Sequence, residues 1–222
     1  NGGGGDRVPR GRPWVYGADV LEADADAGEV VTVRGFRGQA LGDALFSDRS
    51  EITIRMLTRG EVQADERLLR TRLEQAVAFR ESLRIDASAY RLVDGEAGLL
   101  PSLIIDRDAD LLVVQAPSQG MDPLHPTITA LLVDVVKPKG ILARNDPRVR
   151  VLEGLEQKVE VLHGDVPSTV DVSEGRVRYS VDPFRGQKTV LFLDQRENRE
   201  AAARYARGRL LDALSYNGRF AL

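Results

Sequence analysis

The sequence predicts a multidomain α/β and α+β protein, in which a small N-terminal β-barrel precedes a central α+β domain and the beginning of a C-terminal α/β domain. Three observations lead to this prediction. Short β-branched segments separated by glycines fill residues 30–56, apolar residues recur at helical spacing over 66–84, and strand and helix patterns alternate from residue 90 onward. We expect the domains to span 1–70, 71–185 and 186–222.

Composition sets the broad class of the protein. Hydrophobic residues make up 42% and charged residues 29% of the 222 positions, which is typical of a folded globular chain, and no long uncharged run predicts a membrane span. The absence of cysteine excludes disulfides, cysteine-based metal sites and a thiol nucleophile from this stretch. His125 and His163 lack the spacing of metal ligands, so we expect no metal site.

The charge balance constrains how nucleic acid could bind. The formal net charge is -3, so any such binding must use local basic patches. The basic residues are 27 arginines and 4 lysines, and arginine forks onto phosphates, although an arginine-rich composition can also reflect genome base composition. The first residues, Asn1 and four glycines, lack the apolar core of a signal peptide, and we expect a cytoplasmic protein.

The N-terminal unit carries the pattern of a small barrel. Val30 to Val33 and Ile52 to Ile54 are β-branched strand segments, and glycines mark the turns between them. Its aromatic residues Trp14, Tyr16 and Phe46 fit a barrel core or lid better than base-stacking positions. Arginine pairs with phosphate bidentately, and four arginines surround the predicted barrel as candidate RNA contacts: Arg34, Arg37, Arg49 and Arg55.

The central unit follows a helix expected over 66–84. Strands are predicted at 90–93, 103–105, 111–115, 140–144, 159–161, 170–172 and 177–181, with one helix from Thr127 to Val136. A turn at 173–175 joins the last two strands. Glu96 and Asp106 stand near strand ends, and we interpret them as turn and strand-end residues rather than as a general acid/base pair.

The third unit begins with the tract GQKTVLFLDQRENR at 186–199. Asp194 and Glu197 have the spacing of a capping box, which predicts a helix running to Gly208. Residues 209–214 are then predicted as a buried strand, and a turn follows. Segment 186–222 holds 7 basic and 4 acidic residues, which is a local excess of positive charge.

Three stretches together resemble one enzyme family. These are the class I S-adenosylmethionine-dependent methyltransferases that place a C5 methyl on a cytosine of large-subunit ribosomal RNA, in the branch with an N-terminal PUA domain. Residues 7–20, RVPRGRPWVYGADV, resemble the opening of that branch, with Arg12 where histidine is usual, and residues 90–115 resemble its central domain. The 186–199 tract meets ten positions of the motif Gly-Gln-Lys-Thr-Gly-Phe-Tyr-Leu-Asp-Gln-Arg-x-Asn-Arg.

The resemblance implies S-adenosylmethionine as cofactor, ribosomal RNA as partner, and the start of a Rossmann-like methyltransferase domain after a PUA-like barrel. The family's Asp-x-x-x-Tyr-x-Gly-Gly-Phe turn is present, except that Arg219 replaces a glycine. Arg196 and Arg199 are implied RNA contacts beside the cleft. The implied cofactor-binding residues are Lys188, Thr189, Asp194, Gln195, Arg196, Asp212, Ser215, Tyr216, Gly218 and Phe220.

The implied chemistry needs a cysteine nucleophile, and this chain supplies no catalytic residue of that kind. We therefore expect a chain truncated at the start of the methyltransferase domain. The alternative is a non-catalytic RNA-binding module made of the PUA-like and central domains. A full-length open reading frame that continues into a cysteine-bearing α/β domain would favour the enzyme. The target nucleotide and a homodimer stay open.

Overall fold

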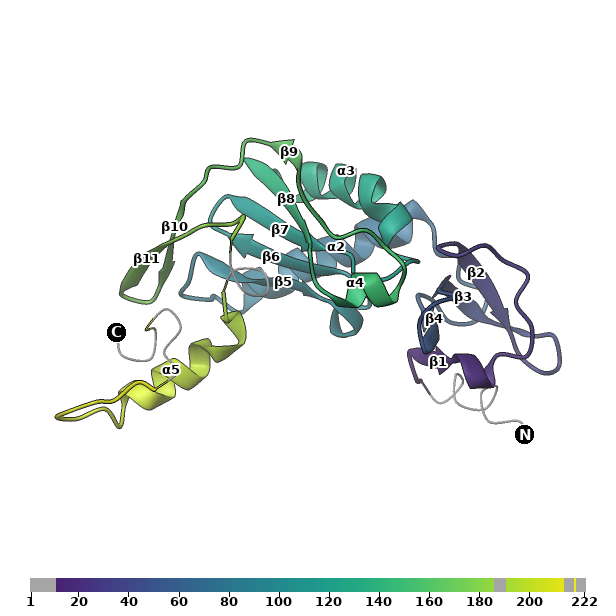
Figure 1. Cartoon of the computed structure of the whole chain (residues 1–222), viewed down its shortest axis with the longest axis horizontal. Coiled ribbons are helices and arrows are strands. Elements are labelled where there is room, and N and C mark those ends of the chain that lie inside the picture. The colour runs from purple at the N-terminus through teal and green to yellow at the C-terminus, as the bar shows by residue number, and fades with distance from the viewer. Residues whose placement is uncertain (1–10, 186–190, 214–217, 219–222) are drawn as a thin grey trace.

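The computed structural model describes residues 11–185, 191–213 and 218 of the chain (Figure 1). Its N-terminal unit is an antiparallel sheet of β1 (Trp14–Tyr16), β2 (Val30–Arg34), β3 (Ala40–Phe46) and β4 (Ile52–Met56), in the order β1-β4-β3-β2. The strand-turn-strand-turn-strand pattern predicted over 30–56 is confirmed. The concave side of this sheet packs around a small apolar core formed by Val15, Ala44, Phe46, Ile54 and Met56.

The aromatic residues of the barrel divide between core and surface. Phe46 is buried, whereas Trp14 and Tyr16 are 38% and 41% exposed on the short strand β1. The indole Nε1 of Trp14 donates a hydrogen bond of 2.9 Å to Glu96 Oε1 of the central unit. Trp14 therefore joins two units instead of filling the barrel core.

A long helix leads from the barrel to the central unit. Helix α2 (Glu66–Ser82) begins after Asp65, whose side chain accepts a hydrogen bond from Leu68 N at 2.8 Å, as an N-cap residue does. Leu69 and Leu73 are buried because their spacing places them on one face of the helix. The helix predicted over 66–84 is confirmed apart from its last two residues.

The central sheet has five strands: β5 (Ala89–Asp94), β6 (Ile104–Asp108), β7 (Leu111–Gln115), β8 (Gly140–Asn145) and β9 (Lys158–Gly164), in sequence order. Only β7 and β8 pair in parallel, and helix α3 (His125–Val136), after the short helix η3 (Asp122–Leu124), makes the crossover between them. Helices α2 and α3 contact each other and share one apolar core with the sheet. Short helices η2 (Gly95–Gly98) and α4 (Val149–Leu152) lie in the connecting loops.

A separate hairpin, β10 (Val170–Glu174) and β11 (Val177–Val181), follows the central sheet. It is held against the segment that leads into β5: Ala87 bridges Glu174, and Ser173 N donates to Ser88 Oγ at 2.8 Å. A second apolar core lies beneath it and includes Leu191 of the C-terminal tract. Leu191 and Leu193 of the C-terminal tract therefore pack against the hairpin through this core.

The C-terminal tract differs from the prediction in three ways. Helix α5 (Arg196–Ala203) follows the short helix η4 (Leu193–Gln195), so its N-cap residue is Gln195 and not Asp194, and the capping box does not form. The helix ends before Gly208. Residues 209–213 are not a strand, and Leu211 is 88% exposed, because within the described residues no neighbouring strand pairs with this segment.

One buried carboxylate joins the barrel to the central unit. Glu153 is 2% exposed and accepts hydrogen bonds from Ser47 Oγ at 2.5 Å, from Arg55 Nη2 at 3.0 Å and from the backbone N–H of Gln119 at 3.2 Å. The backbones are also in close approach, since a Cβ on Gly120 would stand 2.5 Å from Leu45 Cβ. The apolar core continues across this joint, because Leu45 and Leu57 of the barrel belong to the central core.

Arg55 is therefore not the RNA contact that the sequence suggested. Its guanidinium is buried and also donates to Ile52 O at 3.0 Å and Ser50 Oγ at 3.2 Å. The carboxylate that neutralises it lies 98 positions away in the sequence. The charge of Arg55 serves the joint between the units.

We expect the variant Glu153→Gln to lower the free energy of unfolding by about 3 kcal/mol, because it leaves the buried Arg55 charge without its counterion. Urea unfolding of the purified chain measures the change. The matched control is Glu156→Gln, which changes an exposed carboxylate three positions further along and should leave stability within about 0.5 kcal/mol of the parent. Equal stability of both variants would show that the buried ion pair does not hold the joint.

Candidate functional site

The C-terminal tract and the central sheet enclose a polar cavity of about 680 Å³. Its walls come from segments that are distant in the sequence: the end of α2 and the loop after it, strands β5 to β7, Pro147, and residues 191–197. Among the described residues, the charged side chains lining it are three arginines and three carboxylates, namely Arg80, Arg91, Arg196, Asp94, Asp194 and Glu197. A cavity of this size and polarity could accept a nucleotide-sized ligand.

Arg91 is held rigidly in the wall of the cavity. It makes a forked ion pair with the fully buried Asp106, through Nε to Oδ1 at 2.8 Å and Nη2 to Oδ2 at 3.2 Å, and Nη1 donates to Asp94 Oδ1 at 3.2 Å. Burial alone would lower the pKa of Arg91, but the hydrogen bonds and charges of the two aspartates outweigh it and raise that pKa. Asp106 thus pairs with Arg91, and Glu96 accepts a hydrogen bond from Trp14. Both contacts agree with the interpretation of these carboxylates as structural residues.

Arg80 is the cavity arginine that is best placed for an incoming anion. Its Nε donates to Leu92 O at 3.4 Å and its guanidinium lies 5.2 Å from the centre of the Phe79 ring. Among the described residues it forms no ion pair with a carboxylate. Tyr90 lines the same cavity and is half-buried, so part of its ring faces the open space.

The residues around the start of α5 form a short polar network at the cavity. Gln195 Nε2 donates to Asp194 Oδ2 at 3.1 Å, and Asn198 Nδ2 donates to Gln195 Oε1 at 2.9 Å. Arg196 is hydrogen-bonded to Glu197, which holds the pKa of that carboxyl below its usual range. Of the predicted cofactor residues, Asp194 and Arg196 line the cavity, whereas Gln195 stands beside it.

Arg199 does not face the cavity, which corrects its prediction as an RNA contact. The side chain is 7% exposed and pairs in a fork with Glu174 of β10, with both N–O distances at 2.6 Å. Its Nη1 also donates to Phe192 O at 3.3 Å, and burial lowers its pKa. Arg199 anchors α5 to the hairpin and so fixes the position of Arg196.

The rest of the predicted cofactor turn lies mostly outside the described residues. Six residues fall outside the described ranges: Lys188 and Thr189 of the tract, and Ser215, Tyr216, Arg219 and Phe220 of the turn. Asp212 is half-buried, and its Oδ2 has no hydrogen-bond partner within the described residues. Gly218 has a φ of 70°, a conformation that favours glycine. Neither Asp212 nor Gly218 lines the cavity.

The remaining barrel arginines do not form one basic surface. Arg34 and Arg37 lie at the turn between β2 and β3, where Arg34 Nη1 donates to Gly38 O at 3.1 Å. Arg49 lies in the loop after β3, at the opposite end of that strand. The sequence did not predict Arg80, Tyr90 and Arg91 as cavity residues. The one sequence signal for Tyr90 and Arg91 is that they lie in the stretch 90–115, which resembles the family's central domain.

The histidines and the helices of the described ranges bear on metal binding and on membrane insertion. The described ranges contain no group of three or more histidine, aspartate or glutamate side chains that could hold a metal ion. His125 is buried, which lowers its pKa, and its Nε2 lies 3.4 Å from Asn145 Nδ2. None of the helices described is both long and apolar enough to cross a membrane.

Comparison with known proteins places these observations in context. Residues 1–59 match the model of a PUA-like domain. The chain is 36% identical over 227 residues to the ribosomal RNA large subunit methyltransferase I of Aliivibrio fischeri strain MJ11, and 37% identical over 219 residues to the protein of that name from Tolumonas auensis. These alignments cover 99% and 95% of this chain but 57% and 55% of the relatives, so the chain spans little more than half their length.

Two solved structures share the fold. One is a Streptococcus mutans protein described as a SAM-dependent methyltransferase, with a TM-score of 0.82 and 19% identity, and the other is described as a methyltransferase complexed with SAH, with a TM-score of 0.83 and 20% identity. Each alignment covers 98% of this chain, and 57% and 56% of the solved chains. At this level of identity the likeness concerns the fold alone.

We expect Arg199→Ala to lower the free energy of unfolding by about 3 kcal/mol, because the largely buried carboxylate of Glu174 would lose its forked ion pair. Arg204→Ala is the control, since it removes an exposed arginine one turn further along the chain. Thermal unfolding and amide hydrogen exchange of α5 measure the effect. If Arg199→Ala left both stability and exchange unchanged, the ion pair would not anchor the helix.

Proposed function

We propose that the protein carrying this chain is an S-adenosylmethionine-dependent methyltransferase that acts on large-subunit ribosomal RNA, with C5 of a cytosine as the target atom. The observation that carries the proposal is the similarity to a ribosomal RNA large subunit methyltransferase I, which extends over 99% of the chain at 36% identity. The ten matching positions of the 186–199 tract support it, and so does the PUA-like match at the N-terminus.

In this proposal the described part of the chain docks RNA. Arg80 of α2 and Arg196 of α5 both line the cavity, and guanidinium groups bind phosphate through paired N–H donors. Tyr90 of β5 also lines the cavity, and its half-buried ring offers an aromatic face on which a base can stack. The carboxylates of Asp94 and Asp194 would accept hydrogen bonds from base amino groups, so that the cavity selects a nucleotide and not a bare anion.

The described residues do not by themselves form a cofactor site. S-adenosylmethionine would supply the methyl group, and its binding needs a strand that presents the acidic residue and the turn that follows. Here that strand is absent from 209–213, and Asp212 stands apart from the cavity that Asp194 and Arg196 line. We therefore assign RNA docking to this part of the chain and derive no step of methyl transfer from it.

The domain boundaries, the location in the cell and the oligomeric state are also part of the proposal. The separate sheet of the barrel supports a boundary near residue 70, although one apolar core crosses it. The boundary near 185, after which a methyltransferase domain would begin, stays a prediction, and Leu191 packs into the core beneath the β10–β11 hairpin. A ribosomal RNA substrate would place the protein in the cytoplasm. Homodimer formation stays a prediction.

Methyl transfer by the full gene product tests the proposal directly. The full protein, incubated with S-adenosylmethionine carrying a labelled methyl group and with large-subunit ribosomal RNA, should yield labelled 5-methylcytidine after nuclease digestion. Label in another nucleoside would refute the cytosine C5 target. RNA binding without any transferred label would favour a non-catalytic RNA-binding module.

RNA docking by the cavity is tested on the 222-residue chain. We expect the double variant Arg80→Ala/Arg196→Ala to weaken binding to a large-subunit ribosomal RNA fragment by about tenfold and to reduce the salt slope by about 2, because each lost phosphate contact removes about 1. The control double variant Arg84→Ala/Arg204→Ala removes two exposed arginines that do not line the cavity. Equal losses in the two variants would show that RNA senses only overall charge.

A further inference from the structure

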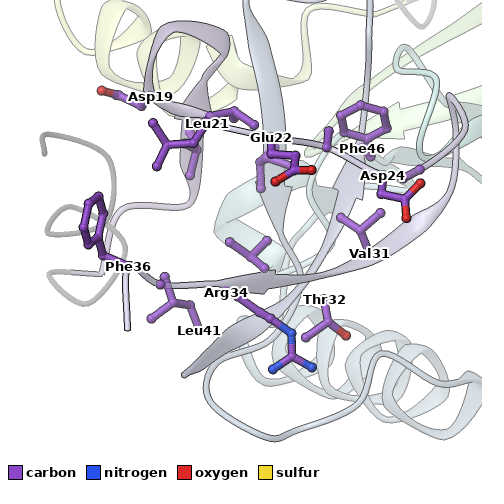
Figure 2. A pocket seen from close by; sticks show the side chains of 17 residues that line it. Asp19, Leu21, Glu22, Asp24, Val31, Thr32, Arg34, Phe36, Leu41 and Phe46 are labelled. Atoms are coloured by element: carbon purple, nitrogen blue, oxygen red, sulfur yellow. The ribbon is translucent and has the colours of Figure 1, made fainter. Parts of the chain in front are cut away.

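A second cavity, of about 490 Å³, lies on the N-terminal barrel and has the shape of a groove. Two runs of consecutive residues face each other across it. One run is 19–25, within the connection 17–29 between β1 and β2, which we call the strap, and the other is 31–36, along β2 and the turn after it. Figure 2 shows Leu21 and Phe36 toward one end of the groove and Phe46 toward the other.

The groove runs along a free sheet edge. Strand β2 pairs with β3 alone among the described strands, and it forms one edge of the order β1-β4-β3-β2. No backbone hydrogen bond within the described residues joins strap residues 20–25 to β2. An edge strand of this kind offers unpaired N–H and C=O groups to an added extended segment.

The walls of the groove are apolar and partly uncovered. They continue the barrel core through Val31, Val33 and Leu41, which are only partly buried. At the rim, Leu21 is 85% exposed and Phe36 is 84% exposed. Large apolar side chains that surround a groove and face water are typical of a surface that binds another molecule.

The charge of the strap decides which kind of molecule fits. Residues 17–29 contain five carboxylates and no basic residue: Asp19, Glu22, Asp24, Asp26 and Glu29. Glu22 and Asp24 are exposed, and neither has a hydrogen bond or ion pair with another described residue. Among the described residues that line the groove, Arg34 is the one cation, and its Nη1 donates to Gly38 O of the turn that follows β2. Such a rim repels RNA phosphates and attracts lysine and arginine.

We propose that this groove binds an extended segment of another protein in which basic and apolar residues alternate. The segment pairs with the free edge of β2. Successive side chains of an added strand point to opposite faces, so its apolar residues enter the groove while its basic residues meet the carboxylates of the strap. This protein-binding surface goes beyond the proposed RNA methylation and does not depend on it.

A capped nonapeptide of alternating lysine and leucine, labelled with fluorescein, serves as the probe for the 222-residue chain. Fluorescence anisotropy should show saturable binding that weakens as salt rises, and a peptide with glutamate in place of lysine should not bind. Glu22→Lys/Asp24→Lys should weaken binding by at least about tenfold, because it reverses two charges beside the groove. Leu21→Ser should also weaken binding, and its exposed position makes a folding defect unexpected.

The matched control is Glu74→Lys/Glu81→Lys, which makes the same change of net charge on the exposed face of α2. It should leave peptide affinity within about twofold of the parent. Protection of the β2 amides from hydrogen exchange on peptide addition would support pairing at this edge. Equal weakening in both double variants, no peptide binding, or no β2 protection would overturn the proposal. The proposal would also be overturned if Leu21→Ser weakened the binding of an RNA fragment, because the groove would then be an RNA-binding surface.

Discussion

The buried carboxylate of Glu153 is the interaction on which the arrangement of the two N-terminal units depends. Its three hydrogen bonds come from Ser47 and Arg55 of the barrel and from the backbone of Gln119 in the central unit. A buried charge keeps such partners only in a narrow range of geometries, because any opening leaves it unsolvated and unpaired. The barrel is therefore held at one orientation, and the apolar core can continue from Leu45 into the central sheet.

A second buried ion pair repeats this logic at the other end of the chain. Arg199 and Glu174 fix α5 on the β10–β11 hairpin, which itself rests on β5. The wall of the polar cavity is thereby built from two sides: Arg91 is fixed by Asp106 within the sheet, and Arg196 is placed by the anchored helix. The geometry of the cavity thus depends on two arginines, Arg91 and Arg199, whose guanidinium groups pair with carboxylates of the protein itself.

The net charge of -3 conceals an uneven distribution of charged residues along the sequence. All five charged residues of the strap are carboxylates, whereas the segment 186–222 contains 7 basic and 4 acidic residues. The carboxylates of the strap repel phosphate and attract basic side chains, so the proposed protein-binding groove and the proposed RNA-docking cavity would favour different partners. In this view the barrel contributes less to RNA binding than its PUA-like character suggests, and the central cavity contributes more.

The sequence by itself determined the order of strands and helices from 30 to 181, because alternation, helical spacing and turn glycines act between near neighbours. It also pointed to Asp194 and Arg196, which lie in a single motif. Only the tertiary structure decided that Arg55 and Arg199 are buried, since their carboxylate partners are 98 and 25 positions away. It also decided that 209–213 is not a strand, because strand pairing and burial depend on the segments that surround a residue and not on its side chain alone.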